Sequence, residues 1–204
     1  MLGVGGLAGP LGRASLLVGL VGAVFGVLAA VVGTRRRDAG VLKLAPRFAV
    51  LCGVAAVGAF ACMEWAMITR DFSLAYVQKV GSWSTPALFN FAAVWSALEG
   101  SILLWLLVLT LLTVGVVVKY RDRLGDPMVG WALAVLFAVG VFFFVLTLGP
   151  ANPFAAGSPG VLDGPGPNPL LQNHILVMFH PPVLDRKSTR LNSSHQIISY
   201  AVFC

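Results

Sequence analysis

The sequence predicts an all-α, polytopic integral membrane protein with four transmembrane helices and a truncated fifth. Two observations of composition support this class: 58% of the 204 residues are apolar types, and only 11% are charged. A soluble domain carries about 25% charged residues, so these few charges could not cover a globule of this size in water. The third observation is four apolar runs, each long enough to cross the roughly 30 Å hydrocarbon core of a bilayer as a helix.

The apolar runs define the expected spans. They are residues 14–33, 48–68, 89–118 and 128–148. Glu64 and Glu99 are the charged residues within them, and Glu64 is close enough to the end of its run to snorkel toward the membrane surface. A fifth run, residues 175–184, would cover only about 15 Å at about 1.5 Å per residue, so it is the start of a span.

Basic residues concentrate in the first and third loops, which the positive-inside bias places in the cytoplasm. The N-terminus and the loops 70–88 and 150–169 are therefore expected outside, with the chain in the bacterial inner (plasma) membrane. A basic triplet beside an apolar run sets membrane orientation more often than it binds nucleic acid, so lipid is the expected partner. The basic residues of the two loops are Arg35, Arg36, Arg37, Lys43, Arg47, Lys119, Arg121 and Arg123.

The composition changes abruptly at Asp185. Four charges fall between Asp185 and Arg190, and each would cost about 2.5–3.5 kcal/mol at the centre of a span. No span can continue through them, so residues 1–184 form the membrane domain and residues 185–204 a separate tail. The tail resembles a translated library adapter found on unrelated proteins, and we interpret it as non-native. The alternative is a hydrophilic C-terminal extension.

Three stretches together resemble the N-terminal part of the CcmF/NrfE family, the haem lyases of cytochrome c maturation. They are Asp71-Phe-Ser-Leu-Ala-Tyr-Val77, Trp95-Ser-Ala-Leu-Glu-Gly-Ser-Ile-Leu-Leu-Trp105, and Asn168-Pro-Leu-Leu-Gln172 followed by His180-Pro181-Pro182. One departure is Leu98, where many family members have histidine. The tryptophan-rich haem-handling segment of the family is absent, so the chain resembles a fragment.

The resemblance implies a cofactor, haem b, and a ligand for its iron. In the family the histidine of His-Pro-Pro is an axial haem ligand on the periplasmic side, which assigns that role to His180. Pro181 and Pro182 stiffen the backbone beside it, and orientation tunes a haem ligand. His174 is given no role.

The supporting motif residues are Trp95, Glu99 and Gly100. An ionisable group in an apolar helix is a functional hypothesis by default, so Glu99 either contacts substrate or bonds to a neighbouring helix. Gly100 permits close approach of another element, and Trp95 is expected near the outer interface.

The resemblance implies that the full-length protein delivers haem at the periplasmic face for covalent attachment to apocytochrome c. Its partners would be a haem chaperone, the other cytochrome c maturation subunits and apocytochrome c. The fragment alone is expected to be inactive. The alternatives are a fragment of a transporter or respiratory-chain subunit with Glu99 in an ion or proton path, and an assembly subunit without a cofactor.

Overall fold

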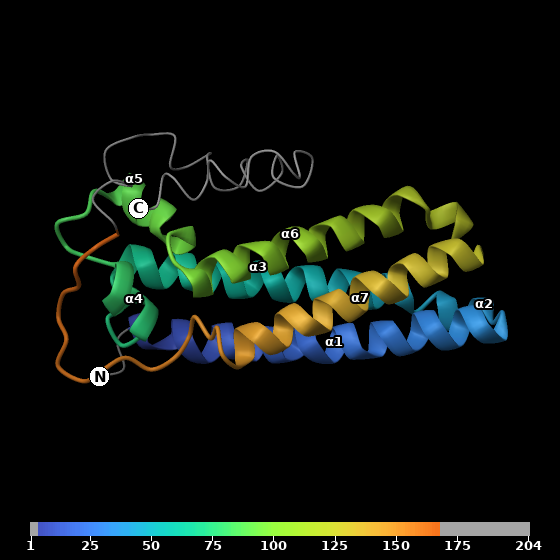
Figure 1. Cartoon of the computed structure of the whole chain (residues 1–204), viewed down its shortest axis with the longest axis horizontal. Helices are drawn as coiled ribbons and strands as arrows, with labels where there is room; N and C mark the ends of the chain where they lie inside the picture. Colours follow the sequence, from blue (N-terminus) through green and yellow to red (C-terminus); the bar gives the residue numbers. More distant parts are fainter. Residues whose placement is uncertain (1–3, 168–204) are drawn as a thin grey trace, which may run out of the picture.

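The computed structural model describes residues 4–167, which form a bundle of four long helices with shorter elements at both ends (Figure 1). The long helices are α1 (Ala8–Arg36), α3 (Ala45–Thr69), α6 (Leu98–Lys119) and α7 (Pro127–Leu148). The shorter elements are η1 (Val4–Leu7), α2 (Ala39–Leu42), α4 (Ala75–Val80), α5 (Ala87–Ala92), η2 (Ala93–Trp95) and η3 (Arg121–Arg123).

The four long helices confirm the predicted fold class. Each is long and apolar enough to cross a membrane, the second span including α2 as well as α3. Within the described residues there is no strand, only an isolated antiparallel bridge between Leu74 and Ala156. The predicted fifth span lies outside the described residues.

The third span begins at Leu98, nine residues later than residue 89 where the sequence placed it. Ala97 is extended (φ −133°, ψ 166°), and the residues before it turn away from the axis of α6. Two side chains hold this turn: the Ser96 hydroxyl donates to the carbonyl of Ala93, and the Asn90 amide donates to the carbonyl of Met67 on α3. Side-chain bonds of this kind compete with helix continuation.

The long helices form a square in which α1 packs on α3 and α7, and α6 packs on the same two helices. Successive helices are antiparallel, so α1 and α6 run in one direction and α3 and α7 in the other (Figure 1).

Close packing of α1 depends on glycines that receive phenylalanine rings. A Cβ atom built on Gly19 would lie 2.3 Å from the ring of Phe144, a distance that no real contact allows. The glycines involved are seven residues apart, about two helical turns, so they line one face of α1. The three pairs are Gly12 with Phe154, Gly19 with Phe144, and Gly26 with Phe137. Small residues that admit large neighbours are the usual means of helix packing in membranes.

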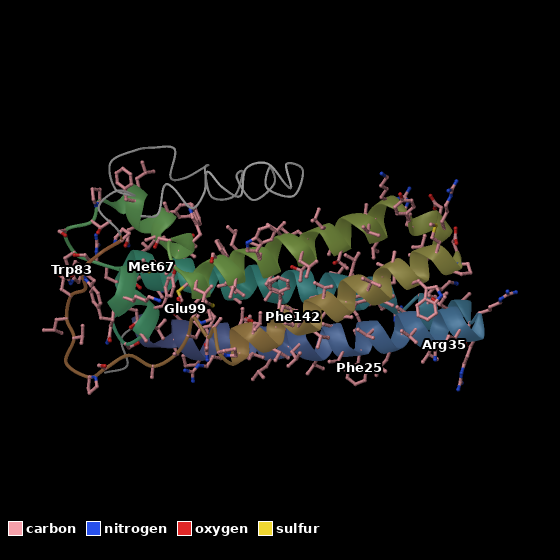
Figure 2. The ribbon with its side chains drawn as sticks, viewed as in Figure 1. Phe25, Arg35, Met67, Trp83, Glu99 and Phe142 are labelled. Atoms are coloured by element: carbon pink, nitrogen blue, oxygen red, sulfur yellow. The ribbon has the colours of Figure 1, made fainter. Side chains whose placement is uncertain are left out.

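The outer faces of the bundle are also apolar. Phe25 of α1 is 50% exposed, although its ring stacks on that of Phe48 of α3 with 6.0 Å between the centroids; Figure 2 labels it on α1. Similar exposed side chains on the other long helices are Val54, Leu112, Val135 and Phe142. An apolar exterior around an apolar interior is solvated by lipid, so the chain is an integral membrane protein.

The two ends of the bundle differ in chemistry. The basic loops lie together at one end, where Figure 2 shows Arg35, and the segments around Trp83 lie at the other. We call the first end, residues 35–47 and 119–126, the basic end. We call residues 70–97 and 149–167 the cap.

Candidate functional site

The cap covers the end of the bundle where α1 begins (Figure 1). It brings α4 beside the loop that follows α7, through two backbone hydrogen bonds between antiparallel segments. The Ala75 N–H donates to the carbonyl of Ala155 at 2.9 Å, and the Gly157 N–H donates to the carbonyl of Ser73 at 2.8 Å. The first family-like stretch, residues 71–77, is therefore a structural part of the cap.

Gln78 holds these two parts together with its side-chain amide. Its nitrogen donates to the carbonyls of Phe72 and Ser158, at 2.7 and 2.8 Å, and its oxygen accepts from the Ser158 N–H at 3.0 Å. No signal in the sequence indicated this role, because a glutamine in a short amphipathic segment is typical of a surface residue.

Tyr76 joins the first family-like stretch to the second. Its hydroxyl lies within hydrogen-bonding distance of two carbonyl oxygens of η2, those of Val94 (2.7 Å) and Ala93 (3.2 Å). Burial raises the pKa of Tyr76 above its usual value, since the charged phenolate would lose its solvation, so the hydroxyl stays a donor.

Gly100 lies directly against this hydrogen bond. A Cβ atom on it would lie 1.7 Å from the Val94 carbonyl oxygen and 2.4 Å from the Tyr76 hydroxyl. We expected another element to approach Gly100 closely. The groups that do so are the Val94 carbonyl of the preceding turn and Tyr76 of α4.

Glu99 lies in the first turn of α6 and forms an ion pair with Lys79 of α4, with 3.0 Å between Oε1 and Nζ. The pair borders an open pocket of about 220 Å³ between α4, α6 and the end of α7. Figure 2 shows Glu99 at this junction of the bundle and the cap. The pocket is lined by Ala75, Tyr76, Lys79, Glu99, Gly149, Pro150, Asn152 and Ala155.

Trp95 ends η2 and packs as a half-buried residue against the apolar core. Its ring meets that of Phe91 edge to face, with 5.5 Å between the centroids. Trp95 therefore belongs to the cap, and the other two supporting residues, Glu99 and Gly100, follow it closely in the first turn of α6.

A second, larger hollow on the cap surrounds Arg70 and Trp83. Arg70 ends α3 with a left-handed backbone (φ 53°) and donates to the carbonyls of Ser82 and Thr85, both at 3.2 Å. Its guanidinium lies 4.8 Å from the centre of the Trp83 ring, which is 59% exposed. The hollow has a volume of about 700 Å³ and includes residues 157–162.

Arg13 ties α1 to the cap, a role that sequence reasoning missed. Its guanidinium donates twice to the carbonyl of Phe154, and the Phe154 ring covers Gly12 one residue before it. The sequence feature that could have indicated this role is a single basic residue directly before the first apolar run.

Glu64 does not snorkel as expected; that prediction was wrong. Its residue is only 8% exposed, and both carboxylate oxygens lack a hydrogen-bond partner among the described residues. It lies one turn before the end of α3, and the cap covers the helix end toward which its side chain was expected to reach.

The proposed haem ligand lies outside the described residues. His180, Pro181 and Pro182 all follow residue 167, as do the other two histidines, His174 and His195. Within residues 4–167, no group of three or more His, Cys, Asp or Glu side chains is arranged to hold a metal ion.

Comparisons with known proteins give a consistent result. The cytochrome c-type biogenesis protein CcmF of Escherichia coli is 35% identical over 153 residues, which is 74% of this chain and 23% of that protein. CycK of Rhizobium meliloti is 33% identical over 174 residues, 85% of this chain and 25% of the relative. The probable biogenesis protein NrfE of Escherichia coli is 35% identical over 133 residues, 62% of this chain and 22% of the relative.

A solved structure, a cytochrome c heme lyase CcmF, has the same fold. It matches with a TM-score of 0.73 and 33% identity, over 87% of this chain and 27% of the solved one. No protein-family model matches the chain. The chain spans only 19% to 26% of the length of the curated relatives it matches.

The bundle and its cap define the class: a polytopic α-helical membrane protein in which two separate sequence motifs meet at one end. The chain is homologous to part of the CcmF/NrfE family of cytochrome c-type biogenesis proteins. This confirms the resemblance that the three sequence stretches indicated.

Proposed function

We propose that the chain is a portion, the N-terminal one, of a cytochrome c haem lyase and takes part in cytochrome c maturation. The observation that carries this proposal is the match to the solved heme lyase, which covers 87% of the chain at 33% identity. The match is too long to be confined to the long helices, so it includes much of the cap. Because the chain spans about a quarter of its relatives, it would act as part of a longer protein.

The cap would face the periplasm, with the N-terminus outside and the chain in the bacterial inner membrane. The concentration of basic residues at the opposite end of the bundle supports this orientation. Haem handling would then occur at the cap end, where haem could reach apocytochrome c.

His180 would be one axial ligand of haem b, and Pro181 and Pro182 would stiffen the backbone beside it. Bound haem would supply the porphyrin that is joined to the cysteine thiols of apocytochrome c. The described part of the chain ends in the cap, where the Gly166 N–H donates to the carbonyl of Gly81 at 3.2 Å. The cap residues would orient the segment that follows.

The proposed partners are a haem chaperone, the other cytochrome c maturation subunits and apocytochrome c. The transporter alternative relied on Glu99, which pairs with Lys79 at the end of the bundle.

A chimera tests the proposal. Residues 1–184 would replace the matching part of Escherichia coli CcmF, and holocytochrome c yield would be measured by haem staining. We expect a functional chimera, in which His180→Ala abolishes most haem retention and cytochrome yield. The matched control, His174→Ala, should leave both nearly unchanged. An unaltered haem spectrum and normal yield in His180→Ala would contradict the ligand assignment.

A further inference from the structure

The basic end contains a cavity that the proposed function does not use. It has a volume of about 360 Å³ and lies between the end of α1, α2 and the start of α7. The lining residues are Thr34, Arg37, Ala39, Leu42, Gly125 and Pro127. It is therefore at the ends of two membrane spans, at the depth where lipid head groups begin.

The charge around this cavity is strongly positive. The basic end has eight basic residues and three acidic ones. Two of the acids are used as helix caps: Asp38 accepts from the N–H groups of Gly40 and Val41, and Asp126 accepts from that of Met128. The third, Asp122, is an exposed residue 3.8 Å from Arg121. The remaining positive charge is uncompensated within the described chain.

Arg37 is the basic residue that lines the cavity. It ends α1 in the left-handed region (φ 52°), which is uncommon for a residue other than glycine or asparagine. Among the described residues its guanidinium has no hydrogen bond or ion pair, so its donors are available to a ligand.

Thr34 also lines the cavity, but its hydroxyl is buried against Gly130 and must rotate to face a ligand. It is only 7% exposed, and its hydroxyl has no hydrogen-bond partner in the described chain. A threonine in a helix ordinarily bonds to a carbonyl of the preceding turn, and Thr34 instead lies against Gly130 of α7. An unpartnered buried hydroxyl is costly, and a bound acceptor would satisfy it after a rotation of the side chain.

We propose that this cavity binds the phosphate of an anionic phospholipid. Arg37 and Thr34 would donate to the phosphate oxygens, since charge-assisted bonds to phosphate suit a guanidinium. Free phosphate shares this chemistry, but a lipid is favoured because apolar side chains adjoin the cavity. Leu42 lines it, and Met128, 80% exposed, follows Pro127. Arg35 lies 5.8 Å from the centre of the Trp131 ring, an arrangement typical of the membrane interface.

The test uses the whole chain, purified in detergent and stripped of lipid. Binding of phosphatidylglycerol, phosphatidylcholine and inorganic phosphate would be measured by native mass spectrometry and by the shift in thermal unfolding. We expect phosphatidylglycerol to bind and stabilise, with phosphatidylcholine and inorganic phosphate at least about tenfold weaker.

Two variants assign the site. Arg37→Asn keeps a residue that tolerates the left-handed backbone, so the fold should be retained while phosphatidylglycerol binds about tenfold more weakly. Thr34→Val should weaken binding in the same direction. The matched control, Arg36→Gln, removes an equal charge beside the cavity and should change binding less than twofold.

Three results would overturn the proposal. One is equal binding of the zwitterionic and anionic lipids. Another is an equal loss in Arg36→Gln and Arg37→Asn, which would indicate charge alone and no defined site. The third is saturation by inorganic phosphate at the concentration where the lipid binds, which would assign the cavity to a free anion. None of these outcomes bears on the role proposed in cytochrome c maturation.

Discussion

Tyr76 and Gly100 show how single residues hold the cap in place. They come from different motifs, and their contact requires a phenol hydroxyl on one side and the absence of a Cβ atom on the other. The Val94 carbonyl is the shared neighbour of both residues. Loss of either property would therefore disturb the same junction between α4, η2 and α6.

Tyr76→Phe should reduce the free energy of unfolding by about 1–3 kcal/mol, because the buried carbonyl of Val94 loses its donor. Gly100→Ala should be at least as harmful, since the new methyl would overlap that oxygen. Thermal unfolding in detergent measures both changes. The control Tyr120→Phe, at a partly exposed tyrosine with no hydrogen bond from its hydroxyl in the described chain, should unfold like the parent protein.

Asp163 makes the cap sensitive to acid. The Trp83 N–H donates to its carboxylate at 2.9 Å, and this bond lowers the pKa of Asp163 below its usual value. A lowered pKa stabilises the folded loop above the ordinary pKa of aspartate, and that contribution is lost as the pH falls through the native pKa. Below that pH, Trp83 fluorescence should change. Asp163→Asn should remove the transition, and its persistence in that variant would show that another group titrates.

The α1 helix illustrates packing at the scale of whole elements. The glycines at every seventh residue admit phenylalanine rings from α7 and from the loop that follows α7. These contacts fix the rotation of α1 about its axis and its position along that axis. Gly33 continues the series at the basic end, where Leu42 of α2 lies against it. A stripe of glycine in one helix thus needs matching large side chains on the elements that pack against it.

Gly19→Ala should destabilise the bundle by about 1–3 kcal/mol, the usual cost of overpacking, because the buried Phe144 ring must move. Gly115→Ala is the matched control on α6: nothing lies within 4 Å of its Cβ position, so no loss is expected. Unfolding midpoints of the two variants provide the comparison. A loss of similar size at both positions would contradict the role of Phe144, because alanine has the higher helix propensity and nothing lies near the Cβ position of Gly115.

The sequence predicted the spans from length and hydropathy but misplaced the start of the third. Residues 89–95 carry no charge and are mostly apolar, so they extend the apolar run from which the span was predicted. The break at Ala97 depends on the contact of Asn90 with Met67, which is distant in sequence. Glu64 was misjudged because its burial depends on the packing of the whole bundle, which the position of a residue within its span does not reveal.

At the scale of the whole molecule, the bundle separates two surfaces of different chemistry. The motif residues Trp95, Glu99 and Gly100 could be selected from the sequence through the family resemblance. Arg13, Gln78 and Arg70 could not, because each donates to a backbone carbonyl of another segment. The acceptors of these bonds, the carbonyls of Phe154, Ser82 and Ser158, all belong to the cap.

The orientation of the bundle can be tested by cysteine labelling at its two ends. Ser158 is an exposed residue of the cap, and Asp122, at the basic end, has an 89% exposed side chain. Ser82, another cap residue, is only 3% exposed. A cysteine there would be protected by burial, so its labelling would not show which side of the membrane the cap faces. In a background without the native cysteines, Ser158→Cys should react with an impermeant maleimide in intact cells, because the positive-inside bias places the basic end in the cytoplasm. Asp122→Cys should react only after permeabilisation. The reverse pattern would place the cap in the cytoplasm, on the wrong side of the membrane for haem delivery to a periplasmic apocytochrome.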